Sequence, residues 1–368
     1  MQHKNRVLPP LSRLFVIGLA LFSWSSICSA GPVANTLFYT TYQAPTPGSH
    51  NVGRVQASYN GNGFSSSGSF TLSNDTAIAS LPTPVGSCCG GGGADGIVMN
   101  PNNGKLLVGS QGSLVYEVNP TTGAYTSADA TVPALHLAVD HSKNFVWASF
   151  LPGKLSKVSI NPFGSPGTVL VVTGSTTIIT SIAFSPSGQA YYTNAPSAGN
   201  GTFGTIDLTT GVTTQLLVNV QAAHGMIYDP FTNTMVLGGD SHITQVSLAG
   251  SILSDLDLDP FSQIPGFQLD QGTVDGQGHV FWASNNGNVV FVDYSNTGLV
   301  GSSLNFVHNQ FFRAALDDFA PLIGPGGTEL PEPQTLVLVV IALLSTLLSQ
   351  RITSRLKRVS IRRLSSTI

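Results

Sequence analysis

The sequence predicts an all-β fold, and three observations lead to this: the composition, an internal repeat and two incomplete repeats near the ends. The chain has 368 residues, of which 42% are hydrophobic and 9% charged, with 40 glycines and 22 prolines. Soluble domains usually carry about 25% charged residues, and long helices are rich in them. The composition therefore favours β structure, as one large domain or two small ones, since β folds often exceed about 200 residues as one unit.

The body of the chain repeats a pattern of three apolar strands, with a polar turn after the first and a glycine-containing turn after the third. A fourth strand fits after the third, for example at residues 169–173 and 214–218. The turn after the first strand begins at Asn100, Asp140, Ser185, Asp229 and Asp275, so successive repeats are 40, 45, 44 and 46 residues apart. Four short strands in about 45 residues are typical of a β-propeller blade.

Two incomplete repeats flank the five complete ones. Residues 37–40, 53–56 and 69–72 match second, third and fourth strands, whereas residues 313–317 match a first strand that only the C-terminal tail follows. Joining them closes the ring and removes exposed sheet edges. We therefore expect residues 31–323 to form a six-bladed β-propeller closed by strand exchange between the termini. A seven-bladed ring or a pair of sandwiches is the alternative.

Residues 1–30 have the three parts of a secretory signal peptide. Three basic residues precede an apolar run over residues 14–27, and small residues lead to Ala30 and Gly31. Such a segment is removed on export, so we expect cleavage between Ala30 and Gly31. A retained anchor helix or a lipid-modified Cys28 is the alternative.

The C-terminal end combines three elements in a defined order. A linker over residues 324–335 contains Pro331, Glu332 and Pro333, an uncharged apolar stretch covers residues 336–350, and residues 351–368 carry six basic side chains. A spanning helix needs about 20 apolar residues. This shorter stretch predicts a transmembrane sorting helix with a basic cytoplasmic tail.

This order resembles the PEP-CTERM sorting signal of bacteria that export polysaccharide. The resemblance covers residues 330–363 and implies that an exosortase-type membrane protease recognises Pro331, Glu332 and Pro333 and processes the chain. It also implies a protein anchored transiently in the membrane and then located in the cell envelope or the extracellular exopolysaccharide matrix. Gln334 and the long basic tail depart from the family pattern. A plain C-terminal anchor is the alternative.

Residues 37–320 repeat an apolar strand, a turn of the Asp-Pro type and a second apolar strand. This pattern resembles the blades of the NHL and lactonase-like propellers. In the calcium-dependent members of that group, Glu, Asn and Asp side chains stand at one mouth of the central channel. Aligning the repeats here places at that mouth Asp95, Gly96, His136, Thr180, Ser181, His224, Asp270, Gln271 and Arg313. Glutamate is absent from this set, which departs from the pattern of the calcium-dependent members.

Imidazole and carboxylate groups bind several divalent metals. Asp95, His136, His224 and Asp270 are therefore candidate metal ligands, and Arg313 is a further ligand-binding candidate. No cofactor other than a divalent metal is expected. Polar groups that line the channel and bind water and backbone are the alternative.

Only Cys88 and Cys89 remain after signal removal, inside a glycine-rich insertion over residues 73–94. An oxidising compartment favours disulfides, and these cysteines can pair with each other or with another chain. The insertion enters a blade at the channel mouth, and long loops in compact domains are often functional. A disulfide between Cys88 and Cys89, a ligand-contacting loop and a plain flexible linker all remain open.

The body of the chain is acidic. Residues 31–333 carry six basic and 18 acidic side chains, a net charge of −12, which argues against nucleic acid and anionic lipid as partners. The sequence lacks a G-x-S-x-G elbow, H-E-x-x-H, a Walker loop and Cys-x-x-Cys. We therefore expect a non-catalytic exported propeller that binds a protein or a glycan. A metal-dependent lactonase-like hydrolase is the alternative.

Overall fold

The computed structural model describes residues 33–42, 50–61, 68–82, 93–149, 153–195, 201–221, 223–259, 268–324 and 328–329. These residues form β-strands joined by turns, and none of them lies in an α-helix. A search of this part of the chain for a helix able to cross a membrane finds none. The expected signal peptide with its cleavage site at Ala30 and Gly31, and the expected helix over residues 336–350, lie outside the described residues.

Four antiparallel sheets follow one another along the chain, and each has its strands in sequence order. A short strand, β12, adds to the third of these sheets, parallel to β16. Their strands are β4 (Ala94–Met99), β5 (Leu106–Ser110), β6 (Leu114–Val118), β7 (Tyr125–Asp129), β8 (His136–Val139), β9 (Phe145–Ser149), β10 (Lys154–Ser159), β11 (Thr168–Val171), β12 (Thr173–Gly174), β13 (Ser181–Phe184), β14 (Ala190–Asn194), β15 (Gly201–Ile206), β16 (Val212–Val220), β17 (Gly225–Asp229), β18 (Thr234–Gly239), β19 (His242–Ser247) and β20 (Ile252–Asp257).

A fifth, larger sheet contains both ends of the body. Its order is β24-β23-β22-β21-β25-β1-β2-β3, and the contact between β21 and β25 is a single parallel pairing of Gln271 with Asp318. Its strands are β1 (Val33–Thr41), β2 (Val52–Tyr59), β3 (Phe70–Ala79), β21 (Leu269–Val274), β22 (His279–Ser284), β23 (Asn288–Asp293), β24 (Phe306–Phe311) and β25 (Leu316–Phe319). A small hairpin of β26 (Ile323–Gly324) and β27 (Thr328–Glu329) follows.

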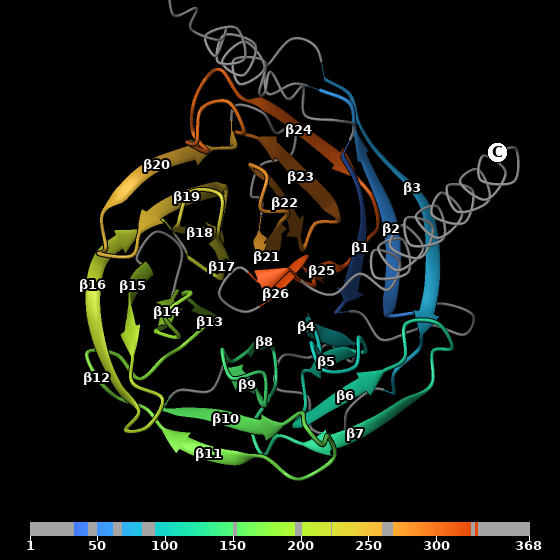
Figure 1. Cartoon of the computed structure of the whole chain (residues 1–368), viewed down its shortest axis with the longest axis vertical. Helices are drawn as coiled ribbons and strands as arrows, with labels where there is room; N and C mark the ends of the chain where they lie inside the picture. Colours follow the sequence, from blue (N-terminus) through green and yellow to red (C-terminus); the bar gives the residue numbers. More distant parts are fainter. Residues whose placement is uncertain are drawn as a thin grey trace, which may run out of the picture.

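The sheets are arranged around a common centre, as in a propeller (Figure 1). The strands nearest the centre are β4, β8, β13, β17, β21 and β25; each contacts the next, and β25 contacts β4. These inner strands are almost entirely buried, whereas outer strands such as β7 and β11 are mostly exposed. The apolar core lies between neighbouring sheets, for example where Trp282 and Val280 meet Val236 and Ile243.

The polar turn of each repeat has a local cause. The side chains of Asn100, Asp229 and Asp275 each accept a hydrogen bond from the backbone N–H two residues further on, at 2.8–3.0 Å. Asx turns of this kind let Asp and Asn close a hairpin without help from distant parts of the chain. The turn residues that mark the repeat in the sequence therefore mark the end of each inner strand in the structure.

The structure confirms that the two ends of the body share one sheet. β25 pairs antiparallel with β1, next to β2 and β3. The expected first strand at residues 313–317 is shifted, because the chain turns at Ala314 and Ala315 and β25 begins at Leu316. Ala315 has a φ of 57°, a left-handed conformation that interrupts an extended strand. This shift changes which side chains reach the channel.

Candidate functional site

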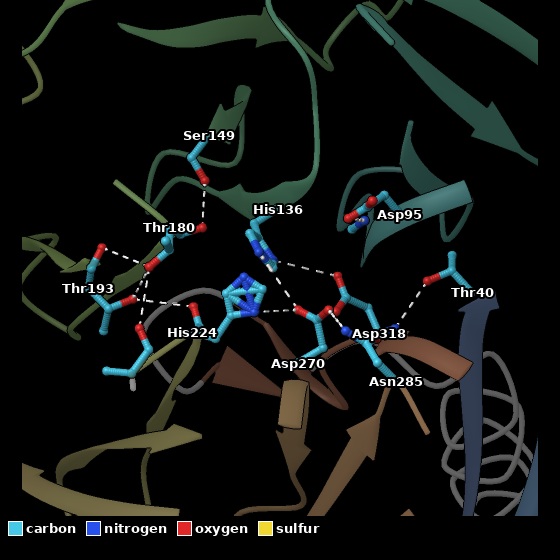
Figure 2. Close-up of polar contacts among 12 residues, drawn as sticks. Thr40, Asp95, His136, Ser149, Thr180, Thr193, His224, Asp270, Asn285 and Asp318 are labelled. Atoms are coloured by element: carbon cyan, nitrogen blue, oxygen red, sulfur yellow. Dashed lines mark hydrogen bonds and ion pairs between the residues drawn. The ribbon is translucent and has the colours of Figure 1, made fainter. Parts of the chain in front are cut away.

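The first residues of the inner strands meet at one mouth of the central channel. Figure 2 shows His136 of β8 between Asp270 of β21 and Asp318 of β25, with His224 beside Asp270 and Asp95 of β4 close by. Four of the expected ligands, Asp95, His136, His224 and Asp270, are therefore brought together by four different sheet segments. Their meeting follows from the ring of inner strands, because equivalent positions of neighbouring strands lie at the same height.

Two histidines and one carboxylate form the first cluster. Oδ1 of Asp270 lies 3.4 Å from Nδ1 of His224 and 3.7 Å from Nε2 of His136. The two imidazole rings meet edge to face with their centroids 4.9 Å apart. One ligand atom from each of the three residues lies within 4.8 Å of the others, close enough for a single ion to bind all three.

Three carboxylates form a second cluster next to the first. Oxygens of Asp95, Asp317 and Asp318 also lie within 4.8 Å of one another, and all three residues are buried. His136 connects the two clusters, because its Nε2 faces Asp270 and its Nδ1 lies 3.8 Å from Oδ2 of Asp318. The mouth thus holds four carboxylates and two imidazoles in contact with one another.

Several of these atoms have no hydrogen bond of ordinary length and angle among the described residues, although Asp270 lies close to both Asp317 and Asp318. They are Nδ1 of His136, Oδ1 of Asp270, Oδ2 of Asp317 and both carboxylate oxygens of Asp318. Buried polar atoms are nearly always paired, and exceptions often mark the place of a bound water or ion. The unpaired atoms therefore point to a ligand at the mouth.

The ionisation states fit metal binding at the first cluster. Burial lowers the pKa of His136 to about 4, against the opposing effect of Asp270, so the imidazole is neutral near pH 7. Burial also acts to raise the pKa of Asp270, but neighbouring His224 and hydrogen bonds from Asp317 and Asn285 act against it, and the pKa is lowered. A neutral imidazole and an ionised carboxylate are the forms that bind metals.

In the second cluster, the pKa values of the carboxyl groups are raised. Burial, followed by the negative charges of neighbouring carboxylates, raises the pKa of Asp95, Asp317 and Asp318 well above the usual range for aspartate. Carboxyl groups that share one buried site cannot all ionise unless a cation compensates their negative charges. In the absence of a cation, protons must supply part of that compensation.

Neighbouring groups hold Asp270 in place. The indole N–H of Trp282 donates to the backbone carbonyl of Asp270 at 3.1 Å, and Nδ2 of Asn285 donates to Oδ2 at 3.2 Å. Gly225 lies directly against that carbonyl, since a Cβ on Gly225 would be 1.9 Å from the Asp270 oxygen. Gly96 has a similar role beside His136, where a Cβ would lie 2.9 Å from the His136 Cα.

Hydroxyl groups support the His224 side of the mouth (Figure 2). Oγ1 of Thr193 donates to the backbone carbonyl of His224 at 3.4 Å, and Oγ1 of Thr180 donates to the carbonyl of Thr193 at 3.1 Å. Oγ of Ser149 donates in turn to the carbonyl of Thr180 at 3.0 Å. These bonds link β9, β14 and the residues before β13 and β17, so the backbone that carries His224 is part of a continuous network.

Arg313 does not join the mouth, although the sequence alignment placed it there. Its guanidinium pairs with Asp75 on β3 and lies over the ring of Tyr39, 5.5 Å from its centroid. The cause is the later start of β25, which places Arg313 before the turn and brings Asp317 and Asp318 to the channel instead. Residues 313–317 were expected to form the first strand, with Asp317 at its end, so sequence reasoning missed both aspartates. Two adjacent acids after Leu316, in a chain with so few charges, were the available signal.

Most side chains at the other end of the channel are apolar. Later residues of the inner strands, among them Val139, Phe184 and Ile227, line a cavity of about 70 Å³ together with Pro321 and Ile323 of the segment after β25. The polar groups are thus concentrated at the mouth where the inner strands begin, and a charged ligand has suitable partners there.

The residues of the first cluster do not fit the calcium site that the lactonase-like resemblance implies. Calcium prefers oxygen ligands in a set of about six to eight, whereas two of the three groups here offer imidazole nitrogen. Imidazole with carboxylate suits Zn²⁺ and neighbouring transition metals. The second cluster, with oxygen ligands alone, has the chemistry that hard cations prefer.

The residues of the expected disulfide and of the sorting motif lie outside the described residues. These are Cys88 and Cys89 of the glycine-rich insertion and Pro331, Glu332 and Pro333 of the C-terminal linker.

Fold and site together define a propeller-like protein with a histidine and carboxylate cluster at one mouth of its channel. No protein-family model matches the sequence, and no curated protein matches it either. The solved structure of Kuenenia stuttgartiensis hydrazine synthase is similar, with a TM-score of 0.50 and 10% sequence identity over 79% of this chain and 91% of that one. At this identity, the similarity supports a propeller-like fold and nothing about activity.

Proposed function

We propose that this protein binds a divalent transition metal ion at the channel mouth through His136, His224 and Asp270, and uses the bound ion to hold a ligand. The observation that carries the proposal is the convergence of two imidazoles and one carboxylate within 4.8 Å. Neutral His136 and ionised Asp270 support it, because neither group needs to lose a proton before it binds a metal. We assign Zn²⁺ as the reference ion, since this donor set suits it.

We also propose that the large sheet comprises two blades, which makes the ring six-bladed. Its two halves each contain four strands and are joined through the single pairing of Gln271 with Asp318. The closed series of contacts from β4 to β25 and back to β4 supports the same count. A crystal structure with seven blades, or with two separate sandwiches, would contradict it.

The bound ion can act in two ways. As a binding protein, the propeller would hold a hydroxyl or carboxylate group of a glycan or protein on the ion's open side, without catalysis. The second candidate is a metal-dependent lactonase-like hydrolase, and one observation favours it. The set supplies three protein ligands, and the His224 side chain is 33% exposed, so a coordination position can face solvent. Catalytic zinc sites commonly have three protein ligands and one open position.

The expected result for metal binding is about one Zn²⁺ at the first cluster of the purified full-length chain. His224→Ala should weaken Zn²⁺ binding by about a hundredfold or more, because removing even a supporting group costs roughly 10- to 100-fold in affinity. Equilibrium dialysis with metal analysis measures this, and Co²⁺ absorption reports nitrogen coordination. His242→Ala is the matched control, since His242 pairs with Asp255 on an outer strand. A wild-type chain that binds neither Zn²⁺ nor Co²⁺ would refute the proposal.

The two candidate roles give different results in a hydrolysis assay. A hydrolase would cleave members of a panel of lactones and esters, lose this activity in chelator and regain it with Zn²⁺. A binding protein would hydrolyse none of them and would show metal-dependent retention on immobilised glycans or proteins.

We further propose, on the sequence evidence, that the chain is exported, sorted by an exosortase-type protease and located in the cell envelope or the exopolysaccharide matrix. Mass spectrometry of the mature protein should show a chain that starts at Gly31 and has lost its C-terminal sorting tail. An intact C-terminus in cells that contain the protease would count against sorting. The same spectrum without reduction tests the Cys88–Cys89 disulfide, which lowers the mass by about two daltons relative to the reduced form.

A further inference from the structure

We propose that Asp95, Asp317 and Asp318 form a second cation site at the channel mouth, specific for a hard divalent cation such as Mn²⁺, Mg²⁺ or Ca²⁺. This site lies beside the proposed transition-metal site and would make the mouth a two-ion centre. It deepens the proposed function and rests on it, since both ions would occupy the same mouth and the same ligand would meet both.

The backbone of β25 is shaped to bring two consecutive aspartates to one place. Successive residues of a regular strand point to opposite faces, so Asp317 and Asp318 would normally diverge. Here the pairing of β25 with β1 is irregular: Leu316 and Phe319 are opposite Thr41 and Tyr39, so β25 contains one extra residue between those pairs. A β-bulge of this kind redirects side chains, and bulges are frequent next to functional sites. The bulge contains Asp317 and Asp318 themselves.

Unpaired buried atoms around the cluster provide a second, independent observation. Asp318 has 0% exposure, and its carboxylate lies close to Asp270 and the backbone N–H of Gln271 without a hydrogen bond of ordinary length and angle among the described residues. His136 is 3% exposed, and its unpaired Nδ1 faces Asp318 at 3.8 Å (Figure 2). A side chain from another strand is thus directed at the cluster, while its Nε2 faces Asp270.

Among the described residues, no lysine or arginine side chain provides a counter-charge to the cluster. The ion pairs of Lys and Arg side chains in the described part of the chain join Lys105 to Glu117 and Arg313 to Asp75, both away from the mouth. Buried carboxylates are normally paired with a cationic side chain or bound to a metal. Since no lysine or arginine of the described residues is paired with Asp95, Asp317 or Asp318, a bound cation would compensate their charge when they ionise.

The donor atoms determine which ion fits. The cluster offers carboxylate oxygens, which suit Mg²⁺, Mn²⁺ and Ca²⁺, whereas imidazole suits Zn²⁺ and copper. The two sites therefore differ in preference, and a mixed pair of ions should fill the mouth. Mn²⁺ is the practical probe for the second site, because its paramagnetism makes free and bound ions distinguishable.

The test uses the full-length chain, freed of metal with a chelator and then dialysed against Zn²⁺, Mn²⁺ or both. We expect about one Zn²⁺ and one Mn²⁺ per chain when both are present. Asp318→Asn should weaken Mn²⁺ binding by about a hundredfold and change Zn²⁺ binding by less than about tenfold, while His224→Ala should do the reverse. Asp229→Asn is the matched control, because Asp229 is equally buried but bonds to Thr232 and Phe231 in its own turn.

The outcomes separate the two proposals. A wild-type chain that binds Zn²⁺ but never Mn²⁺, or an Asp318→Asn chain that binds Mn²⁺ as the wild type does, overturns the second site and leaves the proposed function intact. A chain that binds Mn²⁺ but neither Zn²⁺ nor Co²⁺ overturns the proposed function instead. If circular dichroism shows that Asp318→Asn does not fold, Asp95→Asn provides a second variant. The number of Zn²⁺ and Mn²⁺ ions bound per wild-type chain tests the second site without any variant.

Discussion

Replacing Gly225 with alanine is expected to weaken Zn²⁺ binding by about 10- to 100-fold and to lower the free energy of unfolding by about 1–3 kcal/mol. The added Cβ would lie 1.9 Å from the backbone oxygen of Asp270 and 3.0 Å from the Cα of Gln271. A backbone carbonyl between two inner strands cannot move as a flexible side chain can. β17 and β21 must separate, which displaces Asp270 from His224. Metal titration and urea unfolding measure the two effects.

Gly204→Ala separates the effect on the site from the effect on stability. Its Cβ would also meet a backbone oxygen, that of Thr214, at 2.2 Å, but between β15 and β16 in the outer part of another sheet. We expect a comparable loss of stability with unchanged Zn²⁺ affinity. If Gly225→Ala bound Zn²⁺ as tightly as Gly204→Ala does, the contact between β17 and β21 would not position Asp270.

Replacing Trp282 with alanine is expected to lower the free energy of unfolding by about 3–5 kcal/mol, the usual range for a buried tryptophan. The indole is fully buried and lies against Gly238 and Gly272, where a Cβ would come within 2.1 and 2.5 Å of the ring. Those glycines shape a slot that no smaller side chain fills. The loss also removes the donor to the Asp270 carbonyl. Thermal and urea unfolding measure the stability, and dialysis measures Zn²⁺.

Two further variants distinguish the effect of Trp282 on stability from its effect on Zn²⁺ binding. Trp147→Ala removes a similarly buried tryptophan in another sheet, whose indole nitrogen has no partner among the described residues. It should destabilise the fold without a direct effect on Zn²⁺ affinity. Trp282→Phe retains a ring in the slot but loses the N–H. The loss of Zn²⁺-binding free energy in this variant should therefore exceed its loss of unfolding free energy. Equal Zn²⁺ affinity in Trp282→Phe and wild type would contradict a positioning role for the indole.

The sequence predicted the strands well because each repeat is built from local hairpins. The Asx turn at Asn100 or Asp229 needs no distant partner, and the apolar runs on either side of it form antiparallel strands. The predicted fourth strands at residues 169–173 and 214–218 correspond closely to β11 and β16. The sequence also predicted correctly that both ends of the body share one sheet. One incomplete repeat has only a first strand and the other has only the second, third and fourth strands, so together they form one complete repeat.

The candidate site was predicted in part, and the failures have structural causes. Asp95, His136, His224 and Asp270 were found because they occupy equivalent places in complete repeats, which alignment can detect. Arg313 was misplaced because its repeat is incomplete and contains a left-handed residue at Ala315 and a bulge after Leu316. Both features depend on how β25 fits against β1, a strand about 280 residues earlier in the chain.

By itself, the sequence determined that the chain is an all-β repeat protein, where the inner strands of the complete repeats lie, and that histidine and aspartate are concentrated near their first residues. These properties follow from short-range patterns of apolar residues and turn residues. The tertiary structure alone decided that Asp317 and Asp318 replace Arg313 at the mouth, and that His136 faces a carboxylate with each ring nitrogen. The physical reason is that side-chain direction in β25 depends on pairing with β1, and the meeting of the ligands depends on closure of the ring.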